Sequence, residues 1–287
     1  MLSEKLPVEL SKGFNGLEKI ILREARGSSA EVYLYGGHVT SWKNEHAEEL
    51  LFFSTKAMNS CVKHSLYSIF SPFIGHTRHC LSLQKQFEEE FQYASLNYEF
   101  RLRVALGLGG DLMLTSRIRN MNTNGKPFTF AFAYHTYFSV SDISEVRVEG
   151  LGTLDYLDNL QNKERFTEQG DAITFETEVD RIYLSAPTKI AILDHEKKRT
   201  FAIRKDGLPA AVVWNPWDKK AKALADFGDD EYKLMLCVET AATEKPITLK
   251  PGGEWRGSQE LCAVPSSYCG GLLDARKVLQ CAEKMHY

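Results

Sequence analysis

Residues 128–138 read Phe-Thr-Phe-Ala-Phe-Ala-Tyr-His-Thr-Tyr-Phe, and this stretch decides the fold class. Successive side chains of a β-strand point to opposite faces of its sheet. At the even positions all side chains but that of Thr136 are aromatic, so this face belongs to a core. At the odd positions small residues lead to His135 and Tyr137, which leaves room on the second face. The stretch predicts a strand with one packed face and one open face.

Similar strand-like runs, bounded by Gly, Asn and Asp, recur along the chain and predict an all-β, mainly antiparallel fold. The runs 98–108 and 112–118 flank Gly109-Gly110-Asp111 and predict a β-hairpin. The Gly-rich turn therefore joins two strands and is no dinucleotide fingerprint. Further strands are predicted at 30–35, 127–140, 181–185, 189–194, 199–205, 210–214, 233–240 and 254–264.

Helical periodicity is confined to two short stretches, 219–227 and 274–285. The polar segment 55–97 alternates poorly and has no helical face, so we expect a loop there. We find no internal repeat or linker. The sequence predicts one domain over residues 1–287, with 55–97 as a divergent segment and 270–287 as a C-terminal tail.

Charge and cysteine usage limit the classes of function. The chain has 35 basic and 38 acidic residues, a net charge of -3, so it lacks the basic excess of a nucleic-acid-binding domain. No apolar run is long enough to span a bilayer, and the N-terminus lacks the apolar core of a secretion signal. The six cysteines are scattered and form no C-x-x-C pair, which favours free thiols. We expect a monomeric cytoplasmic protein that acts on a small molecule and binds neither membrane nor nucleic acid.

Two residues stand out as candidates for proton transfer. His135 lies on the open face of the strand at 128–138, where it either faces a ligand or is a hydrogen-bonded histidine in a second packed layer. Glu239 lies in a run that is apolar on both faces, Leu-Met-Leu-Cys-Val-Glu-Thr-Ala-Ala at 234–242. A carboxylate there needs a partner, and burial suits it to act as a general base near neutrality. The alternative is that the strand end is exposed and Glu239 is solvated.

Other candidates are less specific. Asp180 opens a strand, where it either binds a ligand or caps a turn. Trp214 and Trp217 flank a turn and either stack on a sugar ring or close a core. His76 and His79 have a metal-like spacing, but no cysteine or carboxylate set completes a site, and we predict no metal.

Five runs in this order, residues 36–42, 133–138, 179–183, 213–217 and 237–239, resemble the glucose-6-phosphate 1-epimerases, most closely those of plants. These are hexose-6-phosphate mutarotases of the aldose 1-epimerase superfamily. The resemblance implies a galactose-mutarotase-like β-supersandwich that converts α and β anomers of hexose 6-phosphates without a cofactor. It implies His135 as the catalytic acid, Glu239 as the base and Asp180 as a contact for sugar hydroxyls. We also expect Arg78 and Trp214 to bind the substrate.

The segment 62–78 departs from the family pattern. Members of the family carry an Ile-Arg-Gly-Gly-Ile-Pro-type run at this place. In this chain His64 occupies the position of the arginine of that run. Arginine is the natural bidentate partner of a phosphate, and histidine does not replace it. The strands that follow in the family are mostly missing, so 55–97 is shortened. Two alternatives therefore stay open beside the active enzyme: an inactive sugar-binding β-sandwich, and a glycosidase that uses Asp180 and Glu239.

Overall fold

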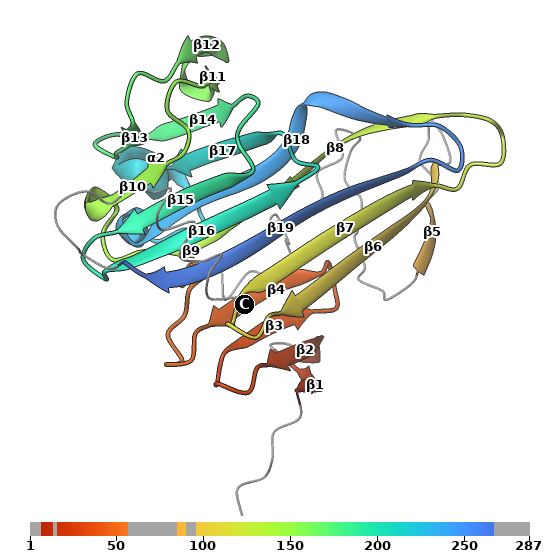
Figure 1. Ribbon diagram of the computed structural model, residues 1–287, viewed down its shortest axis with the longest axis horizontal. Coiled ribbons are helices and arrows are strands. Elements are labelled where there is room, and N and C mark those ends of the chain that lie inside the picture. The colour runs from red at the N-terminus through yellow and green to blue at the C-terminus, as the bar shows by residue number, and fades with distance from the viewer. Residues whose placement is uncertain (1–6, 14–15, 57–84, 90–95, 267–287) are drawn as a thin grey trace, which may run out of the picture.

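The computed structural model of the chain describes residues 7–13, 16–56, 85–89 and 96–266 (Figure 1). These residues form three sheets in which every strand pair is antiparallel, which confirms the predicted fold class. The smallest sheet has the order β1-β2-β3-β4, and it lies in the lower part of Figure 1. Its strands are β1 (Val8–Lys12), β2 (Glu18–Arg23), β3 (Ser29–Tyr33) and β4 (His38–Lys43).

The two larger sheets contain the remaining strands of the described residues. The eight-stranded sheet has the order β13-β10-β15-β16-β19-β7-β6-β5. The seven-stranded sheet has the order β12-β11-β14-β17-β18-β8, with β9 paired to β18. The strands of the first are β5 (Lys85–Glu89), β6 (Leu96–Leu106), β7 (Leu112–Asn120), β10 (Val146–Glu149), β13 (Ala172–Ile173), β15 (Lys189–Asp194), β16 (Arg199–Asp206) and β19 (Glu254–Pro265). Those of the second are β8 (Phe128–Tyr134), β9 (Tyr137–Ser139), β11 (Asp155–Asp158), β12 (Glu164–Thr167), β14 (Val179–Tyr183), β17 (Ala210–Asn215) and β18 (Met235–Leu249).

Helices are few in the described part of the chain. One α-helix, α2 (Trp217–Ala223), follows β17. It overlaps the helix predicted at 219–227 but ends earlier, because Leu224 already has an extended backbone, with ψ 121°. The 3-10 helices are η2 (Ile143–Glu145), η3 (Asn159–Gln161) and η4 (Glu231–Leu234). No helix among residues 7–13, 16–56, 85–89 and 96–266 is long and apolar enough to cross a membrane.

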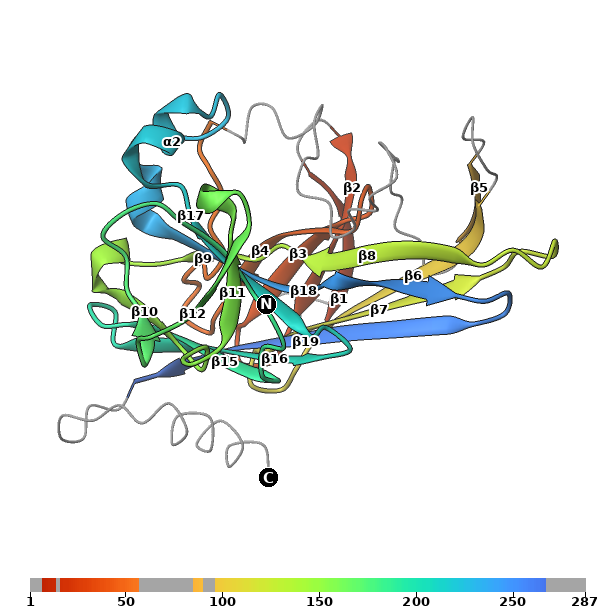
Figure 2. The same cartoon turned by 90° about the horizontal axis from the view of Figure 1, so that it is seen from above.

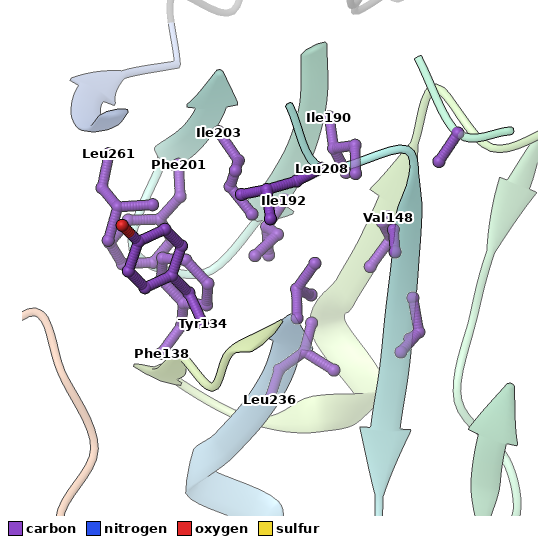
Figure 3. Close-up of a cluster of buried hydrophobic side chains, with 14 of the residues drawn as sticks. Tyr134, Phe138, Val148, Ile190, Ile192, Phe201, Ile203, Leu208, Leu236 and Leu261 are labelled. Carbon is purple, nitrogen blue, oxygen red and sulfur yellow. The ribbon is translucent and has the colours of Figure 1, made fainter. Parts of the chain in front are cut away.

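The core lies between the two large sheets, which form two layers in Figure 2. The even-numbered aromatic side chains of 128–138 point into it, as predicted. Phe138 packs on Phe201 of β16 with ring centroids 4.9 Å apart, and Phe132 packs on Trp255 of β19 at 4.8 Å. Figure 3 shows Tyr134 and Phe138 facing Phe201, Leu261 and their neighbours. Truncating a fully buried ring such as that of Phe132 to alanine is expected to cost about 3–5 kcal/mol.

Three sequence expectations differ from the structure. The strand predicted at 127–140 is two strands, because His135 and Thr136 leave the ladder between β8 and β9. The strand predicted at 233–240 continues to Leu249 as β18. The segment expected to be a loop contains a strand, β5, which pairs with β6 at the sheet edge. The helix predicted at 274–285 lies outside the described residues.

Candidate active site

His135 and Glu239 face each other across two neighbouring strands. The register pairs Tyr134 with Thr240 and Tyr137 with Cys237, so His135 and Glu239 are opposite and point to the same face. His135 Nδ1 lies 2.6 Å from Glu239 Oε1, although 104 residues separate the two in sequence. The side chains are 27% and 14% exposed, so the pair is shielded from bulk water but open to a ligand.

The electrostatics of this contact favour a protonated imidazole. Burial acts to lower the pKa of His135, but the hydrogen bond and negative charge of Glu239 outweigh it and hold that pKa above its ordinary value. A larger fraction of His135 is therefore imidazolium near neutral pH than for a free histidine. An imidazolium donates through both ring nitrogens, and Nδ1–H is directed at the carboxylate.

One atom of each group remains available for chemistry. Glu239 Oε1 accepts from His135 and also lies 3.5 Å from Cys237 Sγ. Within the described ranges, neither Glu239 Oε2 nor His135 Nε2 has a hydrogen-bond partner. Burial, together with the charge of Glu239, raises the pKa of the Cys237 thiol well above its usual value, so this sulfur stays protonated and is no nucleophile. The pair therefore presents one donor and one acceptor.

Asp180 belongs to the same face. It pairs with Trp214 of β17, which pairs with Cys237 of β18, so the three side chains form one row across the sheet. Asn159 Nδ2 donates to Asp180 Oδ1 at 2.6 Å. Burial raises the pKa of Asp180, the hydrogen bond from Asn159 opposes this, and the negative charge of Glu239 raises it further. Asp180 and Glu239 thus stand on one face of the sheet, and the charge of Glu239 acts on Asp180.

The floor beside this row is small and apolar. Ala133, Ala210 and Ala241 are paired across three strands and form a buried cluster with Ile182. Ala133 and Ala241 lie two residues from His135 and Glu239, so they share their face. All three alanines are buried, Ala133 at 6% and Ala210 and Ala241 at 0% exposed, so the face that the alternation at 128–138 predicts to be open is covered here.

The two tryptophans have different surroundings. Trp214 is half-buried and meets the ring of Tyr137 edge-on, with centroids 6.2 Å apart. It thus lies in the row of Asp180. Trp217 packs against Tyr232 at 5.3 Å and belongs to the core cluster. Arg78, His76 and His79 lie outside the described residues.

A cavity opens next to His135 and contains residues that the sequence analysis did not single out. It is lined by His38, Val39, Thr40, Leu51, Phe52, Phe53, Ser54, Leu112, Leu114, Tyr134, His135, Thr136, Tyr137, Phe227, Gln259 and Leu261. Burial lowers the pKa of His38 to about 4, so this side chain is neutral at physiological pH. The run Gly36-Gly37-His38 was the available signal for His38, whereas nothing local marked Asn159 or Gln259.

One group of possible metal ligands occurs in the described part of the chain. Ligand atoms of Asp111, Glu260 and Cys262 all lie within 4.8 Å of one another. Glu260 is also 3.5 Å from Arg204, and burial together with Asp111 raises the pKa of Cys262, which keeps the thiol protonated. The Arg204 guanidinium therefore already supplies a positive charge to the Glu260 carboxylate. The group also lies on the eight-stranded sheet and its β6–β7 turn, away from the acid–base pair.

The fold and this sheet face define a class: an all-β protein with a hydrogen-bonded histidine–glutamate pair beside a small apolar cluster. The chain belongs to the aldose 1-epimerase family, whose sequence profile matches residues 78–262. It is 58% identical over 303 residues to a protein of Cenchrus ciliaris named "putative glucose-6-phosphate 1-epimerase", covering 94% of this chain and 92% of that one.

Solved structures show the same fold. A "putative mutarotase" of Salmonella typhimurium superposes with a TM-score of 0.68 at 20% identity, covering 90% of this chain and 97% of that one. The galactose 1-epimerase of Lactobacillus acidophilus gives a TM-score of 0.65 at 11% identity, covering 91% and 99%. The predicted galactose-mutarotase-like fold is thereby confirmed.

Proposed function

We propose that this protein interconverts the α and β anomers of hexose 6-phosphates, glucose 6-phosphate foremost, by opening and closing the pyranose ring. The observation that carries the proposal is the contact of His135 with Glu239, which leaves Nε2 and Oε2 without a partner among residues 7–13, 16–56, 85–89 and 96–266. Anomer exchange needs one group to take the proton of the anomeric hydroxyl and another to protonate the ring oxygen. The pair supplies both.

The proton balance closes without a further reactant. Glu239 Oε2 takes the proton from the anomeric hydroxyl while His135 Nε2–H protonates the ring oxygen. The bond between C1 and the ring oxygen breaks, leaving an open-chain aldehyde, a neutral imidazole and a protonated carboxyl. After rotation about C1–C2 the ring oxygen attacks the other face of the aldehyde, and both protons return. Positioned acid–base groups accelerate such transfers by about 10²–10⁴-fold.

The substrate class follows from neighbouring residues and from the relatives. Asp180, held by the hydrogen bond from Asn159, accepts hydrogen bonds from sugar hydroxyls, and Trp214 borders the ring. The name of the Cenchrus ciliaris relative supplies glucose 6-phosphate as the first substrate to test. Arg78 remains our proposed phosphate contact. Lys56 pairs with Asp229 at 2.9 Å on the surface and is not assigned to the site.

The overall charge supports the proposed setting. With 35 basic against 38 acidic residues the chain has no excess positive charge to hold nucleic acid or an anionic membrane. We therefore propose a monomer that acts on a small sugar phosphate in the cytoplasm. Sedimentation of the purified protein tests the monomer, and imaging of a tagged copy tests the location.

Exchange spectroscopy of the anomeric protons of glucose 6-phosphate tests the activity. The wild-type protein should raise the exchange rate well above that of a weakly catalytic buffer, and His135→Asn should lose most of the increase. Exchange rates with free glucose and free galactose, measured under the same conditions, show how much the 6-phosphate contributes to the rate. Exchange at the buffer rate with pure wild-type protein would refute the enzyme and favour the inactive sugar-binding alternative. Release of nitrophenol from nitrophenyl glycosides would instead support the glycosidase.

A further inference from the structure

Gln259 connects the two strands that carry the acid–base pair, and it does so from the opposite sheet. It belongs to β19, whereas His135 and Glu239 belong to the sheet of β8 and β18. Its Oε1 accepts from Thr240 Oγ1 at 2.8 Å, and its Nε2 donates to Thr136 Oγ1 at 2.9 Å. Thr136 follows His135 in sequence, and Thr240 follows Glu239. One side chain thus grips both strands immediately beside the two reactive residues.

This connection is fully buried. Gln259, Thr136 and Thr240 are 4%, 6% and 0% exposed, in a core otherwise built largely from apolar side chains. A buried polar group that loses its partner is left unsatisfied at a large cost, so such a network accepts few alternative geometries. Gln259 and Thr136 also line the cavity next to His135.

The strand ladder is interrupted where the connection attaches. His135 and Thr136 lie between β8 and β9, outside the regular ladder. The backbone bond recorded at this break is Val238 N to Thr136 O, at 3.0 Å. With fewer ladder bonds to fix the chain, the hydroxyl of Thr136 provides a second attachment point, directed to the other sheet.

We propose that Gln259 is a positioning residue that holds His135 Nδ1 against Glu239 Oε1. The proposal rests on the function proposed above and extends it. Gln259 itself does not contact the reacting atoms. It fixes the backbone of Thr136 and Thr240 and thereby sets the relative position of the two side chains that precede them. A misplacement of about 1 Å between reacting groups costs about 10²-fold in rate.

The test uses the full chain and four substitutions. Gln259→Met keeps the length of the side chain and removes both hydrogen bonds, whereas Thr240→Val removes one at nearly constant shape. Thr240→Ser retains the hydroxyl and is the conservative rescue. Thr248→Val is the matched control, because Thr248 lies on the same strand, β18, and its hydroxyl meets that of Thr129 at an exposed position.

The readouts are kcat and KM for glucose 6-phosphate, the titration of the His135 ring protons by NMR, and thermal unfolding. Gln259→Met and Thr240→Val should lower kcat about 10–100-fold with KM changed less than about threefold. In both variants the pKa of His135 should fall, since its contact with Glu239 loosens. Thr240→Ser should recover most of kcat, and Thr248→Val should match the wild type.

The outcomes separate a positioning role from a structural one. A folded Gln259→Met protein with lower thermal stability, but with wild-type kcat and His135 titration, would overturn the proposal. If Gln259→Met does not fold, equal kcat in Thr240→Val and Thr240→Ser would overturn it. If the wild-type protein fails to exchange anomers, the proposed function fails by itself, and the His135 titration still decides whether Gln259 holds the pair.

Discussion

Replacing Glu239 with glutamine tests the acid–base pair most directly. The amide has nearly the shape of the carboxyl, and its oxygen still accepts a hydrogen bond from His135 Nδ1–H. It carries no charge and cannot take the proton of the anomeric hydroxyl. We expect the rate of anomer exchange to fall by about 10²–10⁴-fold, the usual contribution of a positioned general base.

The same substitution has a calculable effect on stability. At 2.6 Å the contact between His135 and Glu239 is a charge-assisted hydrogen bond. Such bonds contribute about 1.5–3 kcal/mol, against about 0.5–1.5 kcal/mol for a neutral pair. Glu239→Gln should therefore lower the free energy of unfolding by about 1–2 kcal/mol while His135 is charged.

The pH dependence gives the sign of the effect. The pKa of His135 is raised in the folded protein, so its contribution to stability is fully present below the ordinary histidine pKa of about 6.5. It is lost as the pH rises through the higher pKa of the folded state. The stability difference between wild type and Glu239→Gln should therefore shrink as the pH rises above 6.5, because the charged pair is lost.

Urea unfolding at several pH values between 5.5 and 9, together with anomer exchange by NMR, measures both effects. The matched control is Glu244→Gln, a neutralisation at an exposed position on the same strand. A folded Glu239→Gln protein that exchanges anomers within threefold of the wild-type rate would refute the assignment of the base. A pH-independent stability difference would refute the charged contact.

Three further changes follow from the surroundings of the pair. Asn159→Ala removes the hydrogen bond that opposes the raised pKa of Asp180, so the acid limb of the rate–pH profile should move to higher pH and KM should rise several-fold. Trp214→Leu removes the indole packed against Tyr137, and steady-state kinetics should show a higher KM with kcat nearly unchanged. Lys205 is buried, donates to two backbone carbonyls, and has a pKa lowered by burial to about 8. The pKa of Lys205 is lower in the folded than in the unfolded state, so the unfolded state binds the extra proton between pH 8 and 10.5. Over this range the free energy of unfolding of the wild-type protein should therefore rise by up to about 3 kcal/mol relative to that of Lys205→Met, and urea unfolding measures this difference.

Much of the fold could be predicted from local patterns. The alternation of aromatic and small residues at 128–138 predicted the buried aromatic face of β8, because the period of a strand is two. The second face of β8 is exposed only at Thr129, since Ala131 and Ala133 are also buried. The strand predicted at 189–194 agrees with β15, and the predicted hairpin agrees with β6 and β7. These features depend on neighbours in sequence, which a single chain displays.

Helix and strand ends were harder to predict. The helix predicted at 219–227 begins two residues earlier and ends four residues earlier, because tertiary packing of Trp217 and Ala221 overrides a weak helical pattern. Strand β5 escaped prediction since its sequence, Lys-Gln-Phe-Glu-Glu, is too polar to stand out. It is held in place by pairing with β6, which is a long-range contact.

The sequence by itself indicated His135, at the end of an aromatic strand, and Glu239, a carboxylate in an apolar run. Only the tertiary structure decided that His135 Nδ1 lies 2.6 Å from Glu239 Oε1, since the register of β8 against β18 brings residues 104 apart in sequence into contact. The tertiary structure also brings Asn159 into a hydrogen bond with Asp180. It places Gln259, on the other sheet, in hydrogen bonds with Thr136 and Thr240 beside the His135–Glu239 pair. Alternation and composition are local properties of the chain, whereas hydrogen bonds across strands and between sheets exist only after the layers have packed.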